Sequence, residues 1–266
     1  AVEACAAAAT ETHGTEWLGA VLRAYASLGW EPEPGALAAL AGAVEREAGA
    51  MAAPEAAGAL HSLGSLGLRE ARRPLLALRS RVEAAAHGGE LTTHCVANAL
   101  HAHAALGLGP PGAVLAAAAR NADPRSWDAR GLCCLFQCQL LWGAPLPPPL
   151  RSAAEDAWRS EALGRGPTPS KWQGAVCACL RRLGVPHKQE ALLGDPPVRV
   201  DVRVTVPGCR VVVEVDGPTH FARNSRRRLG ATALRDELLR SRGWEVVSVP
   251  YFEWPRENGS GGGARR

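Results

Sequence analysis

The sequence is poor in several features that would assign it to a familiar class of protein. Only two of its 30 basic residues are lysines, and its net charge of +4 is far below that of a histone-like polycation. No apolar run is long enough to span a bilayer, so we expect no membrane partner. None of the eight cysteines forms a C-x-x-C pair, which favours buried free thiols in a reducing compartment over disulfides or a metal site. Because the first residue is not Met, we expect the chain to begin inside a longer protein.

The composition is that of a folded protein. Apolar residues make up 47% and charged residues 21% of the 266 positions, which is enough for one or two domains with real cores. The positive charge is unevenly placed: residues 220–228 carry four arginines and no acid. This local concentration says more about a binding surface than the small net charge does.

Residues 12–165 have the pattern of a helical-repeat array. A Leu-Gly or Trp-Gly pair closes an apolar helix five times, at intervals of 38, 40, 36 and 41 residues. The glycines are Gly29, Gly67, Gly107, Gly143 and Gly184. One helix pair per interval is typical of an α-solenoid. The alternative is an irregular bundle, because helices commonly end at glycine. In a solenoid, exposed side chains such as Asn98 and Arg120 would be candidates for the concave face.

The character of the chain changes after residues 164–169 (GRGPTP). Ser170 is suited to cap a helix over 171–183, and a second helix is expected from Thr232, as its cap, to Gly243. Strands are expected at 188–193, 198–206, 210–215 and 246–249. Two apolar strands joined by a helix predict a right-handed crossover within one sheet. The tail, residues 257–266, has the composition of a flexible end.

The arginine loop is a candidate RNA-binding segment that follows the strand ending at Asp216. Arginine forks bind phosphates, an aromatic ring stacks on unpaired bases, and an amide pairs with a base edge. The residues expected to contact RNA are Phe221, Arg223, Asn224, Arg226, Arg227 and Arg228. The alternative is a solvated loop whose arginines pair with the neighbouring acids.

Several residues in fixed order give residues 170–254 a close resemblance to a RAP domain. They are Val200-Asp201, Glu214-Val215-Asp216-Gly217-Pro218, His220-Phe221, Asn224, Gly230, Thr232, Leu238-Leu239, Gly243-Trp244, Val249-Pro250 and Glu253-Trp254. The upstream units resemble octotricopeptide-type or FAST-kinase-like helical repeats. The resemblance implies RNA binding in chloroplasts or mitochondria, with a role in transcript stability, processing, translation or ribosomal RNA handling.

The same segment is similar to the restriction-endonuclease fold, which implies a possible catalytic site. Such nucleases hold Mg²⁺ with an Asp and a Glu on adjacent strands and place a Lys two residues after the Glu. Asp201 and Glu214 match the acids, but Asp216 stands at the lysine position. His220 would be a substitute, whereas arginine is a poor base because it stays protonated. We therefore expect no catalytic residues and no cofactor, with Mg²⁺ required only by the nuclease alternative.

Together these patterns predict an α+β protein with an α-solenoid over 12–165 and a restriction-endonuclease-like α/β RAP domain over 170–256. We expect an RNA-binding protein in which the repeats select single-stranded RNA and the RAP domain clamps it. Further partners would be the ribosome or other RNA-processing proteins. Two alternatives remain: a metal-dependent endoribonuclease and a ribosome-associated structural scaffold.

Overall fold

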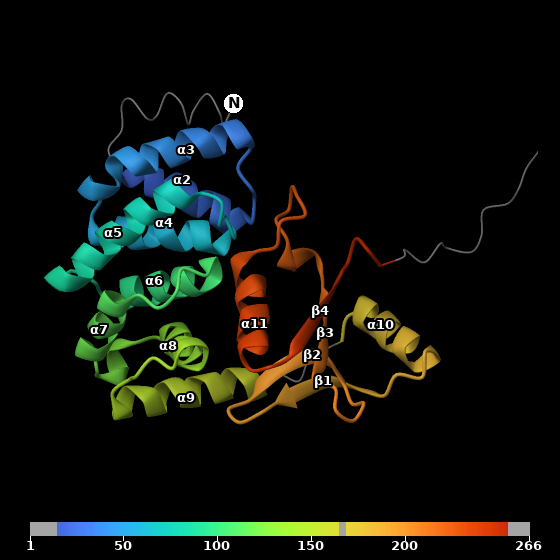
Figure 1. Cartoon of the computed structure of the whole chain (residues 1–266). Coiled ribbons are helices and arrows are strands. Elements are labelled where there is room, and N and C mark those ends of the chain that lie inside the picture. Colours follow the sequence, from blue (N-terminus) through green and yellow to red (C-terminus); the bar gives the residue numbers. More distant parts are fainter. Residues whose placement is uncertain (1–14, 165–168, 255–266) are drawn as a thin grey trace, which may run out of the picture.

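The computed structural model describes residues 15–164 and 169–254. It has the expected α+β architecture, with a curved array of helices followed by a four-stranded sheet (Figure 1). The predicted tail at 257–266, and parts of the expected domain ends and of the 164–169 break, lie outside these residues. In the described part of the chain, no helix combines the length and apolarity that a bilayer crossing requires.

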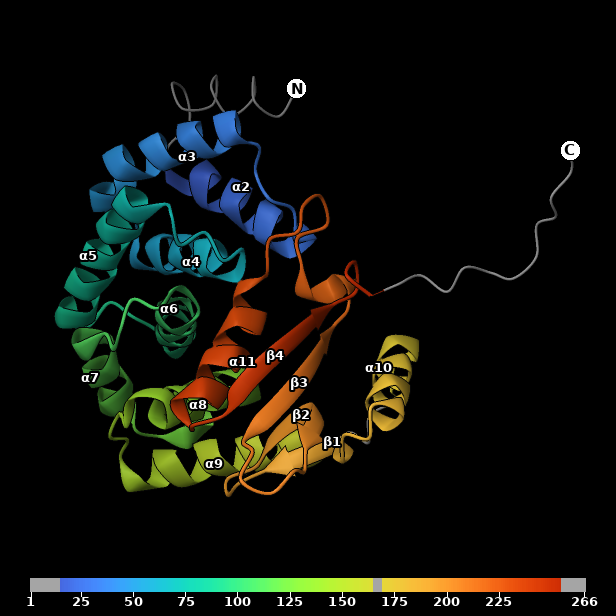
Figure 2. The same ribbon diagram turned by 45° about the vertical axis from the view of Figure 1, so that its right-hand side comes forward.

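The array consists of helix pairs in two layers, as the glycine spacing predicts. Its helices are α2 (Thr15–Leu28), α3 (Pro34–Glu47), α4 (Ala53–Ser65), α5 (Arg72–Gly88), α6 (Thr93–Leu106), α7 (Gly112–Arg120), α8 (Ala129–Trp142) and α9 (Pro148–Leu163). Helices α2, α4, α6 and α8 form the inner layer, and α3, α5 and α7 lie outside it (Figure 2). Each pair therefore packs on the next, and one alanine- and leucine-rich core runs through the array.

Four of the five predicted glycines follow the inner helices, whereas Gly184 follows α10 (Lys171–Arg182) of the C-terminal module. All five predicted glycines have positive φ, and Gly107 and Gly143 cap α6 and α8 in the left-handed conformation. A side chain is disfavoured there, which is why the sequence marks these helix ends with glycine. Residues at one distance before each glycine consequently occupy equivalent places in successive repeats.

The C-terminal module is a mixed sheet between two helices. Helix α10 (Lys171–Arg182) is capped by the Ser170 hydroxyl, which accepts from the Gln173 N–H at 3.1 Å. The remaining elements of the module follow in this order: β1 (His187–Leu193), β2 (Val198–Val204), β3 (Val211–Asp216), α11 (Gly230–Ser241) and β4 (Glu245–Pro250).

Sheet order is β1-β2-β3-β4, antiparallel except for the parallel β3/β4 pair that α11 connects. Helix α10 covers one face of the sheet and α11 the other. The expected strands and crossover are confirmed within a few residues. The expectation that Thr232 caps α11 is wrong: the helix begins at Gly230, and the Thr232 hydroxyl lies 3.1 Å from His220 Nδ1.

Helix α11 belongs to two cores at once. One side packs on the sheet, and the other places Leu234 against Ala104 and Ala105 of α6. At its first residue the backbone touches α4 so closely that a Cβ on Gly230 would lie 1.9 Å from the Gly64 carbonyl oxygen. Module and array therefore meet in close packing along α11.

This contact predicts that Gly230→Ala destabilises the protein, because the new methyl group meets backbone that cannot move aside. We expect a loss of about 2–3 kcal/mol in urea unfolding, as for other overpacked sites. Gly174→Ala is the matched control: it lies in α10 with no atom within 4 Å of the added Cβ. The control is expected to gain up to about 1 kcal/mol through helix propensity. Equal stabilities of the two variants would contradict the close approach.

Candidate nucleic-acid interface

Two of the three nuclease-like acids lie on β3 and point toward α11. Glu214 and Asp216 alternate with Val213 and Val215, which pack toward α10, and both acids are 2% exposed. Glu214 Oε2 is 2.7 Å from a guanidinium nitrogen of Arg235 on α11. Asp216 Oδ2 accepts from Arg228 at 2.8 Å and from the Ser248 hydroxyl. Each acid is thus buried beside an arginine.

Asp201 lies where the sheet opens between β2 and β3. These strands pair only at Val202–Val213 and Arg203–Val212. Beyond that point, Asp201 Oδ2 accepts the Val215 N–H at 2.8 Å, replacing a missing strand partner. The carboxylate therefore stabilises the split in the sheet.

Glu214 is in an unusual electrostatic state. Its pKa is raised to about 8, chiefly by burial and also by the charges of Asp201 and Asp216, while Arg235 opposes the shift. Its Oε1 has no hydrogen-bond partner within residues 15–164 and 169–254. A carboxyl group that holds its proton at neutral pH is a poor ligand for Mg²⁺.

The acids do not fit the magnesium site that the nuclease fold implies. Glu214 holds its proton at neutral pH, Arg228 already neutralises Asp216, and Asp201 is engaged with the Val215 N–H. No three His, Cys, Asp or Glu side chains among the described residues are grouped so that they could hold a metal ion. The contacts between these acids and arginines hold α11 and the arginine loop against the sheet.

Arg228 is the central cation of this network. Its guanidinium bridges Asp216 at 2.8 Å and Asp236 of α11 at 2.7 Å, and Arg240 adds a 3.2 Å contact to Asp236. His220 Nδ1 lies 3.4 Å from Asp216 Oδ1. Asp216, which stands where a nuclease places lysine, is thus neutralised by Arg228 of the arginine loop.

Asn224 docks the arginine loop on the helical array. Its amide donates to the Glu31 carbonyl oxygen and accepts the Glu31 N–H, both at 2.8 Å. An amide recognises a base edge with the same pair of hydrogen bonds, but here Asn224 makes them to the backbone of Glu31, which follows α2.

Arg227 makes the matching charged contact. It lies 2.7 Å from the Glu31 carboxylate and 2.5 Å from that of Glu70, while Ser225 hydrogen-bonds the same Glu31 side chain. The loop therefore connects the turns that follow α2 and α4.

The six predicted RNA contacts consequently differ in accessibility. Phe221 is 2% exposed and packs edge-on against Phe252 at 5.1 Å, so it is part of the core. Of the four arginines in this loop, only Arg223 and Arg226 are exposed, and the Arg226 guanidinium lies 4.6 Å from the centre of the Phe252 ring. The structure brings all six residues together on one loop but turns only these two cations toward solvent.

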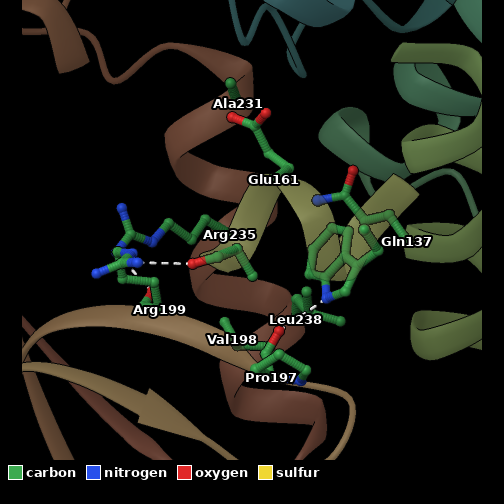
Figure 3. A pocket seen from close by; sticks show the side chains of 10 residues that line it. Gln137, Glu161, Pro197, Val198, Arg199, Ala231, Arg235 and Leu238 are labelled. Atoms are coloured by element: carbon green, nitrogen blue, oxygen red, sulfur yellow. Dashed lines mark hydrogen bonds between the residues drawn. The ribbon is translucent and has the colours of Figure 1, made fainter. Parts of the chain in front are cut away.

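A cleft between array and module holds two cations that the sequence analysis missed (Figure 3). Its volume is about 390 Å³, and its walls come from α8, α9, β2 and α11. Arg199 and Arg235 lie on one side, Gln137 lies opposite, and the Trp158 ring and Glu161 complete the lining.

Backbone contacts hold the cleft open in this shape. Arg199 donates to the Ala162 carbonyl at 2.7 Å, Arg235 donates to the Arg199 carbonyl at 2.9 Å, and Trp158 Nε1 donates to the Pro197 carbonyl at 2.8 Å. The two arginines are 36 positions apart and in no basic run. The one hint in the sequence to a role for Arg199 is that it stands two residues before Asp201 on the same strand, β2.

Comparison with known proteins confirms the RAP domain. The model of the RAP domain family matches residues 213–260. The rice "RAP domain-containing protein, chloroplastic" is 38% identical over 50 residues, which cover 19% of this chain and 8% of that protein. The bovine "FAST kinase domain-containing protein 3, mitochondrial" is 43% identical over 44 residues, or 16% of this chain and 7% of its own length. The family match therefore covers β3, α11 and β4 of the module, and this chain aligns with less than a tenth of the length of either relative.

The raised pKa of Glu214 predicts how stability depends on pH. Between pH 4.5, its ordinary pKa, and about 8, the unfolded chain releases this proton while the folded protein keeps it, so stability falls as pH rises. Glu214→Gln keeps the size and shape of the side chain but removes the group that titrates. Relative to wild type, we expect its unfolding free energy to increase by on the order of 2–4 kcal/mol from pH 5 to pH 8.

Urea titrations at the two pH values measure this difference. Glu237→Gln, at an exposed position of α11, is the control and should follow the wild type. Parallel curves for wild type and Glu214→Gln would show that Glu214 is ionised throughout.

Proposed function

We propose that this protein binds single-stranded RNA in a chloroplast or mitochondrion, with the array selecting the RNA and the RAP domain clamping it. The observation that carries the proposal is the RAP domain at 213–260, seated against the inner layer of a helical array. The organelle is inferred from relatives that are named chloroplastic and mitochondrial. Transcript stability, processing, translation or ribosomal RNA handling would use such a clamp, with the ribosome or processing proteins as further partners.

The cations at the border of array and domain support the clamp. Arg223 and Arg226 are exposed on the loop, and Arg199 and Arg235 line the cleft. Guanidinium groups bind phosphate through forked hydrogen bonds and retain their charge at any physiological pH. Because Arg227 and Arg228 are engaged in ion pairs, they support the surface and do not need to contact RNA.

The exposed loop arginines give a test by salt dependence. Arg223→Ala combined with Arg226→Ala should reduce the salt slope of RNA binding by about 1.4, since each phosphate contact in single strands contributes roughly 0.7. The melting temperature should stay unchanged. Arg227→Ala is the contrasting variant, because it removes the bridges to Glu31 and Glu70 and should lower stability. A double variant with the wild-type salt slope would contradict phosphate contact by this loop.

The paired acids predict that the protein does not cut RNA. Purified protein incubated with single-stranded RNA and Mg²⁺ or Mn²⁺ should leave the RNA intact, because Glu214 is protonated, Asp216 is neutralised by Arg228 and Asp201 is held by the Val215 N–H. Asp201→Asn and Glu214→Gln serve as controls. Cleavage by the parent that both variants abolish would establish the nuclease instead.

A further inference from the structure

The inner helices carry one polar side chain at the same place in each repeat. These residues stand six positions before the glycine that ends each inner helix, and we call them the reading row. The reading row consists of Arg23 on α2, His61 on α4, His101 on α6 and Gln137 on α8. All four are exposed or half-buried, although the helices around them are rich in buried alanine and leucine. The position is therefore polar in every repeat where packing alone would favour an apolar residue.

Two neighbouring members of the reading row, His61 and His101, lie side by side. The His61 and His101 rings are 5.1 Å apart, and Arg130 of α8 reaches past α6 to lie 3.2 Å from His61 Nε2. On α6, Asn98 and His94 form a further polar pair at 3.1 Å. The result is a continuous polar strip across α4, α6 and α8.

Arg23 extends this strip to the first described repeat. A Cβ at Gly19 or Gly58 would come within 3.2 or 3.7 Å of its guanidinium, so the absence of side chains at both positions leaves room for it. Gly19 is in α2 and Gly58 in α4, which means that Arg23 lies across the groove between the two inner helices. Two glycines thus accommodate one cation on the inner face.

The chemistry of the strip suits hydrogen bonding to bases. The pKa of His61 is lowered to about 3 and that of His101 to about 4, chiefly by burial and also by the charge of Arg130. Each ring is therefore neutral at physiological pH and carries one donor and one acceptor nitrogen. Because Arg130 engages His61 Nε2 at 3.2 Å, the other nitrogen of His61 is the one left for a base edge. The groups that act on these two rings are cations or other histidines, with no carboxylate among them.

At its far end the reading row enters the cleft. Gln137 faces Arg199 and Arg235 across that space (Figure 3). A strand lying along the row would therefore place its backbone beside these two guanidinium groups. The row leads from the exposed Arg23 to the proposed phosphate contacts of the clamp.

We propose that the reading row contacts the base edges of single-stranded RNA, one side chain per repeat. This rests on the proposed RNA-binding function and adds which surface selects the sequence and in what order. Helical repeats are well suited to such recognition because equivalent positions recur at a constant step. The order along the RNA follows the order of the repeats, so residues adjacent in the row govern adjacent nucleotides.

The test selects bound RNAs from a random single-stranded pool with wild type and with Arg23→Ala, His61→Ala, His101→Ala and Gln137→Ala. Each variant should lose about tenfold in base preference at one nucleotide, the size of one good base contact. The affected nucleotide should move along the site in the order of the repeats. Arg46→Ala on α3 and His87→Ala on α5 are matched controls, being an exposed arginine and an exposed histidine of the outer helices.

The outcomes separate this proposal from the function on which it rests. If wild type binds RNA and the row variants select the same sequences as wild type, or if the outer controls change the selection equally, the reading row is wrong and the RNA-binding proposal stands. If wild type binds no RNA even at low salt, the proposed function itself fails. Where a histidine-to-alanine variant unfolds, the asparagine variant at that position replaces it, and it should change the preferred base instead of removing the preference.

Discussion

The docking of α11 and the arginine loop on the helical array is the constraint on which the remaining structure depends. The Gly230 backbone lies against the Gly64 carbonyl, and Asn224 pairs with the peptide groups of Glu31. Trp158 packs against both the array core and the module core. Since these contacts are close-packed and paired, the cleft between α8, α9, β2 and α11 has a defined shape.

A nuclease-like set of acids has been turned into an internal support in this module. Buried carboxylates are costly unless they are paired or protonated, and both solutions occur here. Asp216 and Asp236 share Arg228, whereas the pKa of Glu214 is raised to about 8 by burial. Asp201 holds the open point of the sheet through the Val215 N–H, one residue before Asp216, which binds Arg228 of the docked loop.

In the proposed function, selecting and clamping RNA are divided between two parts that pack against each other. The array offers the polar strip on its inner helices, and the C-terminal module supplies cations at the end of that strip. Close packing matters for this division, because a base contact at one end and a phosphate contact at the other must hold the same strand. Flexible attachment of the two parts would lose that register.

The sequence by itself determined the elements and their order. Glycine at a regular interval, β-branched runs and a fixed set of RAP residues are local patterns, and local patterns decide where helices and strands begin and end. Tertiary structure alone decided which arginines face solvent. Arg223 to Arg228 look alike in the sequence, yet Arg227 meets Glu31 and Glu70 from the other end of the chain, and Arg228 meets Asp216 across the sheet. The cleft arginines and the side-by-side histidines were hidden for the same reason, since the neighbours of a side chain are set by packing between segments that are distant in the sequence.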